Sequence, residues 1–339
     1  MTYMRLARNY EYAYGLIKAR MGNQLKQHEF EAILGCKGPI DLNRVLKTTA
    51  YGESLTRSKV NTFEDIIKTI TVSASNYVEN LTNHMPNSDL EMIDTCKKIV
   101  ESRSWVNLLK TEINQDNVIT NVDVITFGTF PLGYSDFEKF YKNNNKSSEL
   151  YQVVEDSLSL SKKYNSVAPL LKIILFLCEI ASSKIPKSNR SKWRSLSKLI
   201  NHVHDATLIE LNILSIQSGI ASEINEEWDF FKEVLKKNHI NIFLPKTIEQ
   251  TIDILKKSRY GICLETKYEN NINDVLERFP YCVMFKEAHS ILAGYPFLPS
   301  TVVAGIMLIL VEVRNIKLAI ASVDGKIDRL KALRLMIIS

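Results

Sequence analysis

The sequence predicts an all-α protein, and three observations support that prediction. Only 12 glycines and 9 prolines occur among 339 residues, too few for a fold rich in tight turns. Residues 296–322 form an apolar run with the periodicity of a buried helix. Long helical patterns also recur roughly every 85 to 110 residues, and such self-similarity indicates stacked supersecondary units.

The run at 296–322 is the most apolar helix candidate in the chain. Its start is marked by Pro299 and by the hydroxyls of Ser300 and Thr301, and its end by Asp324-Gly325. The apolar residues step by three or four positions and therefore share one helix face, wide enough to be wholly buried. The stepped residues are Ile306, Leu310, Val313, Ile316 and Ile320, and Met307 and Val311 widen the face.

Two charged residues interrupt this run. A membrane span needs about 20 mostly apolar residues, and Glu312 and Arg314 break the stretch before that length, so we interpret it as a core helix. We expect Glu312 to pair with Arg314, or with Arg5 or Arg20 across helices. Such pairing is the more ordinary role for an acid in a core helix than that of a tuned catalytic carboxylate.

The first predicted unit spans residues 1–88. It opens with a helix over 5–27, whose apolar face is formed by Tyr10, Tyr14, Ile17 and Met21. A charged hook containing Gly and Pro follows, a second helix begins near Asp41, and a third covers 63–81. Turn-forming residues at 84–88 end the unit.

The second predicted unit spans residues 89–198. It begins with a long helix over 89–113, and the β-branched segment 122–132 has the propensity of a short strand. A helix over 170–181 is of core length and too short to cross a bilayer. The basic segment 184–198 closes the unit as a predicted loop.

The third predicted unit spans residues 199–339 and includes the closing helix. A helix ending at Gly219 carries the sequence ELNI at 210–213, a loose echo of EVRNI at 312–316. Further helices are predicted over 247–260 and 273–287. The unit ends in a tail that alternates cationic and apolar residues over 326–338. Such a tail can lie on a membrane surface or pack against the closing helix, and both interpretations stay open here.

Composition and cysteine spacing indicate a reduced, soluble protein. Apolar residues make up 45% and charged residues 24% of the chain, and the net charge is a mild +5. The cysteines are five in number, lie 19 or more positions apart and include no CxxC, which argues against a disulfide framework or a zinc site. No apolar segment follows the N-terminus, so we expect no secretory signal and a cytoplasmic location.

Motifs that would carry catalysis are missing. The glycines at 128–133 have the spacing of a phosphate-binding loop, but Tyr134 stands where a lysine is needed. His202-x-His204-Asp205 contains metal-ligating residue types, yet positions two apart on a helix point in different directions. We therefore expect no enzymatic activity, no cofactor and no metal site.

The segment 184–198 carries six positive charges, no acid and one tryptophan, Trp193. It is the segment of the chain that best fits a nucleic-acid-binding surface. The simpler alternative is a solvated loop that binds no nucleic acid. We expect part of it to face an acidic partner surface or anionic lipid headgroups. The residues assigned to this contact are Lys187, Arg190, Lys192 and Arg194.

Several short sequence motifs stand in a distinctive order. Near the end, Pro296-Phe297-x-Pro299 precedes the apolar helix with Glu312-x-Arg314-Asn315. Near the start stand Tyr10-x-Tyr12-Ala13, Lys18-Ala19-Arg20-Met21 and Leu46-x-x-Thr49-x-Tyr51, and FGTFPL follows at 127–132. In this order they resemble the C subunit of archaeal and bacterial A/V-type rotary ATPases, which is equivalent to the eukaryotic subunit d.

The resemblance implies an architecture and a role. Three alike helical units would sit around a pseudo-threefold axis as a funnel, with short extended hooks between helices and the last helix packed near the first unit. The protein would be a non-catalytic central-stalk subunit, cytoplasmic and peripheral to the membrane. It would join the rotor shaft of the ATPase head to the membrane proteolipid ring and transmit torque for proton or sodium transport. Neither a small-molecule substrate nor nucleic acid is implied as a partner.

The alternative function comes from another class. It is a basic helical adaptor that binds nucleic acid through residues 184–198. The two functions differ in salt dependence, because phosphate contacts release counterions and weaken steeply as salt rises.

Overall fold

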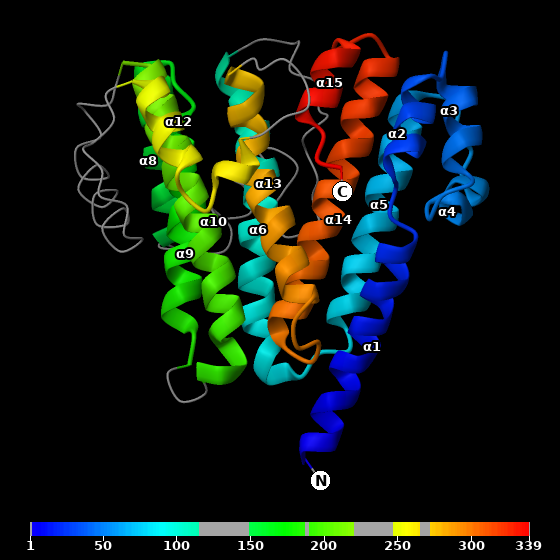
Figure 1. The fold of residues 1–339 in the computed structure, drawn as a ribbon, viewed down its shortest axis with the longest axis horizontal. Coiled ribbons are helices and arrows are strands. Elements are labelled where there is room, and N and C mark those ends of the chain that lie inside the picture. The colour runs from blue at the N-terminus through cyan, green and yellow to red at the C-terminus, as the bar shows by residue number, and fades with distance from the viewer. Residues whose placement is uncertain (1, 115–148, 187–189, 220–246, 265–271, 339) are drawn as a thin grey trace.

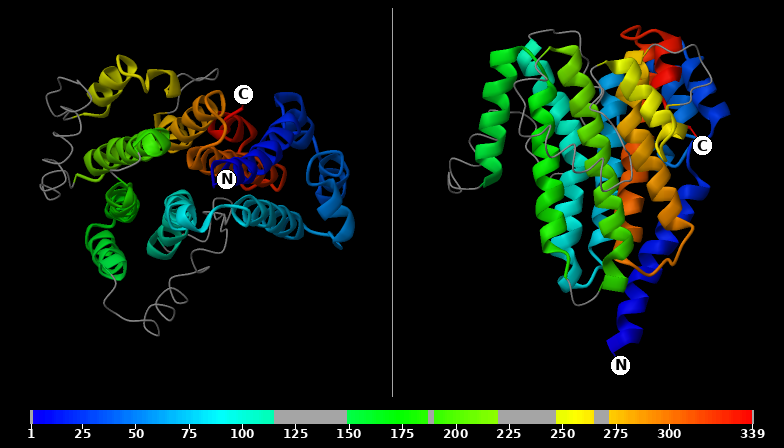
Figure 2. Two further views of the ribbon diagram at one scale, coloured as in Figure 1. Left: turned by 90° about the horizontal axis from the view of Figure 1, so that it is seen from below. Right: turned by 60° about the vertical axis from the view of Figure 1, so that its left-hand side comes forward.

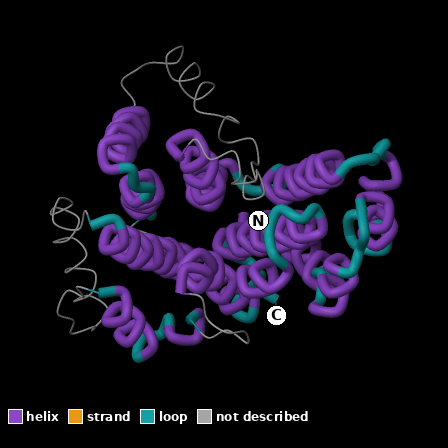
Figure 3. Tube along the Cα trace, turned by 90° about the horizontal axis from the view of Figure 1, so that it is seen from above, coloured by secondary structure: helices purple, strands orange, loops and turns teal. Residues whose placement is uncertain are grey.

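The computed structural model describes residues 2–114, 149–186, 190–219, 247–264 and 272–338, which form thirteen α-helices and two short 3-10 helices (Figure 1). Among these residues there is no strand, so the all-α prediction is confirmed. Figure 3 shows the helices joined by loops in the part described. The segments predicted at 122–132 and 128–133 lie outside it.

The helices follow in this order: α1 (Thr2–Gly22), α2 (Gln27–Leu34), α3 (Pro39–Leu46), α4 (Gly52–Arg57), α5 (Phe63–Thr82), α6 (Asn87–Asn114), α8 (Glu149–Tyr164), η2 (Ala168–Leu170), α9 (Leu171–Lys184), α10 (Arg190–Gln217), α12 (Ile248–Lys256), η4 (Gly261–Cys263), α13 (Ile272–Leu292), α14 (Pro299–Val323) and α15 (Arg329–Leu335).

The start of the chain differs from its prediction in one respect. The first helix ends at Gly22 and not at residue 27, and α2 occupies the first part of the predicted hook. The backbone N–H of Lys26 donates to the Glu29 carboxylate at 2.8 Å, so a new helix start is capped there. The helix predicted at 63–81 agrees with α5, whose N-cap Thr62 accepts a hydrogen bond from the backbone N–H of Asp65.

The long helices run roughly along one direction, and the N-terminal end of α1 extends beyond the others (Figure 2). The ends of α5, α9 and α13 and the starts of α6, α10 and α14 lie at this same end (Figure 1). Helices α5 and α6 diverge above their turn, and α14 packs against both of them. The last long helix therefore fills the space between two helices of the first third of the chain.

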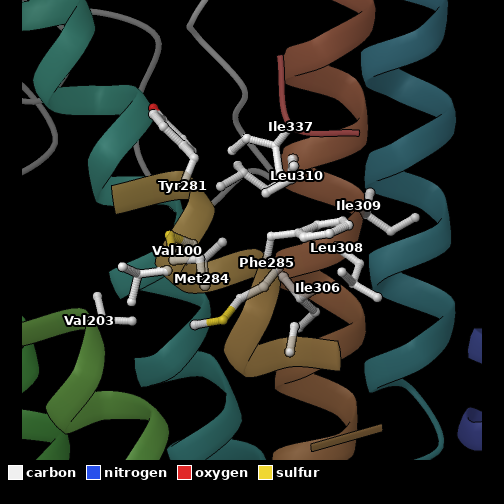
Figure 4. Packing of buried hydrophobic residues seen from close by; sticks show 14 of the residues in the cluster. Val100, Val203, Tyr281, Met284, Phe285, Ile306, Leu308, Ile309, Leu310 and Ile337 are labelled. Atoms are coloured by element: carbon white, nitrogen blue, oxygen red, sulfur yellow. The ribbon is translucent and has the colours of Figure 1, made fainter. Parts of the chain in front are cut away.

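Helix α14 is the centre of the hydrophobic core. Every residue from Pro299 to Ala321 is buried, as the width of its apolar face predicted. It packs against α1, α2, α5, α6, α10, α13 and α15. In Figure 4, Ile306 and Leu310 of α14 lie in one cluster with Met284 and Phe285 of α13 and Val100 of α6. The expected packing of the last helix against the first part of the chain is confirmed.

Two distant turns are built in the same way. The sequences LKTTAYG at 46–52 and LKKSRYG at 255–261 each carry a Thr or Ser whose hydroxyl donates to the carbonyl of the leucine, at 2.6 and 2.7 Å. The same hydroxyl oxygen accepts from the backbone N–H of the tyrosine, at 3.3 and 3.1 Å. A Cβ on Gly52 or Gly261 would lie 2.1 or 2.5 Å from a lysine carbonyl oxygen, so each turn requires glycine.

This repeated turn fits the expectation of alike units. The division at residues 88 and 198 and the pseudo-threefold funnel stay predictions. Helix α10 passes through residue 198 without a break. None of the described helices is both long enough and apolar enough to span a membrane.

The approach of α1 to α14 at Gly305 yields a stability prediction. A Cβ at Gly305 would lie 2.7 Å from both Cγ1 and Cδ1 of Ile17. Gly305→Ala is therefore expected to lower the free energy of unfolding by about 1–3 kcal/mol, as overpacking does. Denaturation by urea, followed by circular dichroism, measures the change. In an Ile17→Ala background the added methyl group should cost less.

The matched control for this prediction is Gly15→Ala, in the middle of the exposed side of α1. A Cβ at Gly15 meets no atom within 4 Å. Since alanine favours helix over glycine by about 1 kcal/mol, this variant should be neutral or more stable. Equal effects at the two glycines would contradict the packing of α1 on α14.

Candidate functional site

The residues of the family-like motifs meet inside the protein as buried polar contacts between helices. Arg20 of α1 donates through Nη2 to Glu312 Oε1 of α14 at 3.0 Å. The guanidinium of Arg20 lies 4.3 Å from the ring centroid of Tyr51 and 5.9 Å from that of Tyr77. Glu312 is only 3% exposed, and Tyr51 is fully buried. Of the pairings considered for Glu312, the one with Arg20 is confirmed.

Burial sets the electrostatics of this cluster. Loss of solvent raises the pKa of Glu312, against the charge of Arg20 and its hydrogen bond, which lower it. Burial also raises the pKa of Tyr51 well above its usual value, and the charge of Glu312 adds to the effect. Burial disfavours the charged form of Arg20, but the neighbouring tyrosines and Glu312 raise its pKa above the ordinary value. Arg20 therefore stays a cation beside a carboxylate that is costly to bury.

Thr49 places Tyr51 in this cluster. Its hydroxyl closes the turn after α3 by donating to the Leu46 carbonyl, and the Thr49 hydroxyl oxygen accepts a hydrogen bond from the Tyr51 N–H. The tyrosine ring then faces inward, toward α1 and α14. The motif Leu46-x-x-Thr49-x-Tyr51 is thus a turn that delivers an aromatic ring to Arg20.

Arg314 and Asn315 hold the C-terminal tail on α14. Arg314 Nη1 donates to the Leu335 carbonyl at 2.9 Å, and its guanidinium lies 4.2 Å from the Tyr281 ring centroid. Asn315 donates to the Ile337 carbonyl at 2.6 Å and accepts from the Ile337 N–H at 3.0 Å. Of the two interpretations of the tail, packing against the closing helix is the one observed.

Tyr10 joins a third buried contact, at the start of α6. Its hydroxyl donates to the carboxylate of Asp89, which is 1% exposed. Lys192 of α10 donates to both oxygens of the same carboxylate, at 2.5 and 2.7 Å. Three helices meet at Asp89, and the ammonium of Lys192 is engaged there.

Tyr12 and the residues Pro296 and Phe297 lie toward the same end of the molecule. The ring of the half-exposed Tyr12 is 4.3 Å from that of His84. Phe297 lies in the turn before α14, and its ring centroid is 6.4 Å from that of Tyr14 and 5.5 Å from that of Tyr295. These aromatic contacts fix the turn at 293–298 against α1.

The basic segment 184–198 is a helix over its second half, which corrects the predicted loop. Helix α10 begins at Arg190, because Trp193, Leu196 and Ile200 recur at helical spacing and are buried. Trp193 is 4% exposed, so its ring is not available to stack on a base. Arg194 is exposed, whereas Lys187 and the side chain of Arg190 lie outside the description.

A further buried contact was not anticipated from the sequence. Arg103 of α6 donates to Glu210 of α10 at 2.6 Å and to the Thr207 hydroxyl at 2.7 Å. A sequence signal for it exists: an acid after Val or Ile, followed two positions later by Arg or Asn, occurs at 40–43, 100–103, 209–212 and 311–314. The copies at 100–103, 209–212 and 311–314 lie in the long helices α6, α10 and α14, and the copy at 40–43 lies in the short helix α3.

The residues considered for a metal make protein contacts instead. His202 Nδ1 lies 2.8 Å from Glu287 Oε2, and Arg259 bonds both groups. Asp205 accepts from the Tyr260 hydroxyl at 2.9 Å. Within the described ranges no group of three or more His, Cys, Asp or Glu residues could hold a metal ion.

Two cavities among the described residues are small. One of about 10 Å³ borders Arg20, Tyr77 and Glu312, and one of about 130 Å³ borders Lys198 and Glu287. Pockets for small molecules usually measure about 300–1,000 Å³. The arrangement joins helices through buried charges.

Comparison with known families gives a match over most of the chain. The family model described as ATP synthase (C/AC39) subunit matches residues 13–332. No curated protein matches the chain.

The Arg20–Glu312 pair yields a stability prediction. Glu312→Ala is expected to lower the free energy of unfolding by about 3–5 kcal/mol, because it leaves a buried guanidinium without its partner. Glu312→Gln keeps the volume and an acceptor oxygen and should cost less. Equilibrium unfolding in urea measures both variants.

The matched control is Glu53→Ala. It removes an ion pair with Arg57 in which both side chains are 77% exposed, and exposed pairs contribute little. Unfolding of this variant should not differ measurably from that of the unchanged protein. A Glu312→Ala variant as stable as the Glu53→Ala variant would show that the buried pair is dispensable.

Proposed function

The chain belongs to the ATP synthase (C/AC39) subunit family, and from this premise we propose that it is a central-stalk subunit of an A-type or V-type ATPase. In this role it connects the rotor shaft of the soluble head to the membrane proteolipid ring. It transmits torque that drives, or is driven by, proton or sodium transport. It does so as a peripheral, cytoplasmic and non-catalytic component.

The observation that carries the proposal is that residues of the motifs form buried contacts between helices. Arg20 and Glu312 are 292 positions apart in the chain and form a buried contact. Asp89 joins α1, α6 and α10, and Arg103 joins α6 to α10. A subunit that passes torque from one partner to another needs a body that resists twisting, and buried contacts between distant segments supply that resistance.

The absence of catalysis is part of the proposal. Inside the protein Arg20 pairs with Glu312 and Arg103 with Glu210, and the two cavities described are too small for a nucleotide. ATP chemistry would then belong to other subunits of the complex, with no cofactor in this one.

The nucleic-acid adaptor is the weaker alternative. Its best feature is the cationic segment 184–198 with its tryptophan, but Trp193 is buried and Lys192 is bound to Asp89. Lys184 also has a protein partner, Glu91, at 2.9 Å. Tight binding of duplex or single-stranded nucleic acid that weakens steeply with salt would restore this alternative.

Removal of the subunit tests the proposed role. An ATPase complex stripped of this chain is expected to keep ATP hydrolysis by its soluble head while losing ion pumping, because only the mechanical connection is broken. Hydrolysis is measured by phosphate release and pumping by a pH- or sodium-sensitive dye in vesicles. Adding back the purified chain should restore pumping. Loss of hydrolysis in a head that lacks the chain would contradict a purely mechanical role.

Arg194, an exposed cation of the basic segment 184–198, allows a test of the partner contact. If Arg194 faces an acidic partner or anionic lipid, Arg194→Glu should slow assembly severalfold at low ionic strength and little at high salt, since exposed charges act over about 10 Å at 0.1 M salt. Surface plasmon resonance on the remaining complex measures the rate. Arg44→Glu, on exposed α3, is the matched control. Equal rates for the two variants across a salt series would show that Arg194 is a solvated surface residue and makes no partner contact.

A further inference from the structure

One cavity lies where three long helices meet, at the end of the molecule beyond which α1 extends. Its volume is about 130 Å³, and its walls come from α10, from the end of α13, from the turn after α13 and from the start of α14. Helices α10, α13 and α14 pack against one another there (Figure 1). Tyr295 is one of the lining residues and is 66% exposed, so the cavity lies at the protein surface.

The start of α14 brings unpaired hydrogen-bond donors to this cavity. Ser300 lines it and is 0% exposed, and its hydroxyl has no hydrogen-bond partner among the described residues. In the same part of the chain, no group accepts from the backbone N–H of Leu298 or of Ser300. Both residues lie at the N-terminal end of a helix of 25 residues. Because a buried donor without an acceptor is unfavourable, these groups favour a ligand that accepts hydrogen bonds.

The charges around the cavity favour an anion. Lys198 of α10 lines it, is exposed, and forms no ion pair with a residue that the structure describes. Glu287 also lines it, but the Glu287 carboxylate is held by His202 Nδ1 at 2.8 Å and by the guanidinium of Arg259. The N-terminus of a long helix adds about half a positive charge. The ammonium of Lys198 and the start of α14 therefore make the cavity electropositive.

We propose that this cavity is a binding site for a phosphate group, supplied either as free phosphate or by the headgroup of an anionic phospholipid. Helix N-termini bind phosphate through their free N–H groups and their dipole, and Lys198 adds the cation. The hydroxyls of Ser195 and Ser290 also line the cavity. A cavity of about 150 Å³ can hold benzene, so one of about 130 Å³ has room for one phosphate group. The proposal rests on this cavity and does not require the rotor role.

Isothermal titration calorimetry tests the site with inorganic phosphate as the probe. The purified full-length chain at pH 7.5, at constant ionic strength and without other oxyanions, is expected to bind one phosphate saturably. Lys198→Met should weaken binding about tenfold, because a charged hydrogen-bond donor is lost, and Ser300→Ala should weaken it severalfold. The matched control is Lys59→Met, which removes an exposed lysine between α4 and α5 and should leave the affinity unchanged.

Vesicle flotation distinguishes the two sources of the phosphate group. If a lipid headgroup is the ligand, the chain should float with phosphatidylcholine vesicles that contain phosphatidic acid and not with vesicles of phosphatidylcholine alone. Lys198→Met should then abolish flotation, and Lys59→Met should not. Calorimetric binding of inorganic phosphate without flotation would assign the site to the free anion.

Two results would overturn the proposal. The first is that the chain neither binds phosphate saturably nor floats with the anionic vesicles. The second is binding that Lys198→Met and Ser300→Ala leave unchanged. Both variants should fold, because Lys198 is exposed and Ser300→Ala removes only a hydroxyl without a described partner. Circular dichroism of each variant checks this before the titration.

Discussion

A carboxylate inside a fully buried helix is the constraint on which the rest of this structure depends. Glu312 lies in α14 with no exposed residue between Pro299 and Ala321, and an unpaired charge in such a place is strongly unfavourable. Arg20 compensates it, which requires α1 to run beside α14 and brings the two ends of the chain together. The close approach at Gly305 follows from the same requirement, since only a residue without Cβ leaves room for Ile17.

The same physical solution appears at other points of the body. Buried acids pair with a cation or a tyrosine from a distant helix, as Asp89 does with Lys192 and Asp205 with Tyr260. The two similar turns at 46–52 and 255–261 each deliver a tyrosine to such a site. Hydrogen-bonded charges of this kind fix which helices are neighbours more strictly than apolar packing does, because a shifted partner leaves a charge buried and unsatisfied. A scaffold built in this way suits a component whose proposed task is mechanical.

The density of charged residues in the sequence did not indicate which side chains face outward. Six cations between 184 and 198 suggested a solvated or partner-facing loop, but the apolar residues among them have helical spacing, and this periodicity builds the start of α10. Burial of Trp193 then turns Lys192 toward Asp89, while Arg194 stays exposed. Periodicity is a stronger guide to orientation than charge density, because burial of an aromatic ring outweighs the weak screened interactions of surface charges.

The sequence by itself determined the helical class, most helix positions, the burial of α14 and the family, since these depend on local periodicity and on motifs read along the chain. It also narrowed the partner of Glu312 to three arginines. Only the tertiary structure decided among them, and only it placed the tail on Asn315 and joined Arg103 to Glu210. These contacts join residues tens to hundreds of positions apart, and their geometry depends on how whole helices pack, which no local pattern encodes.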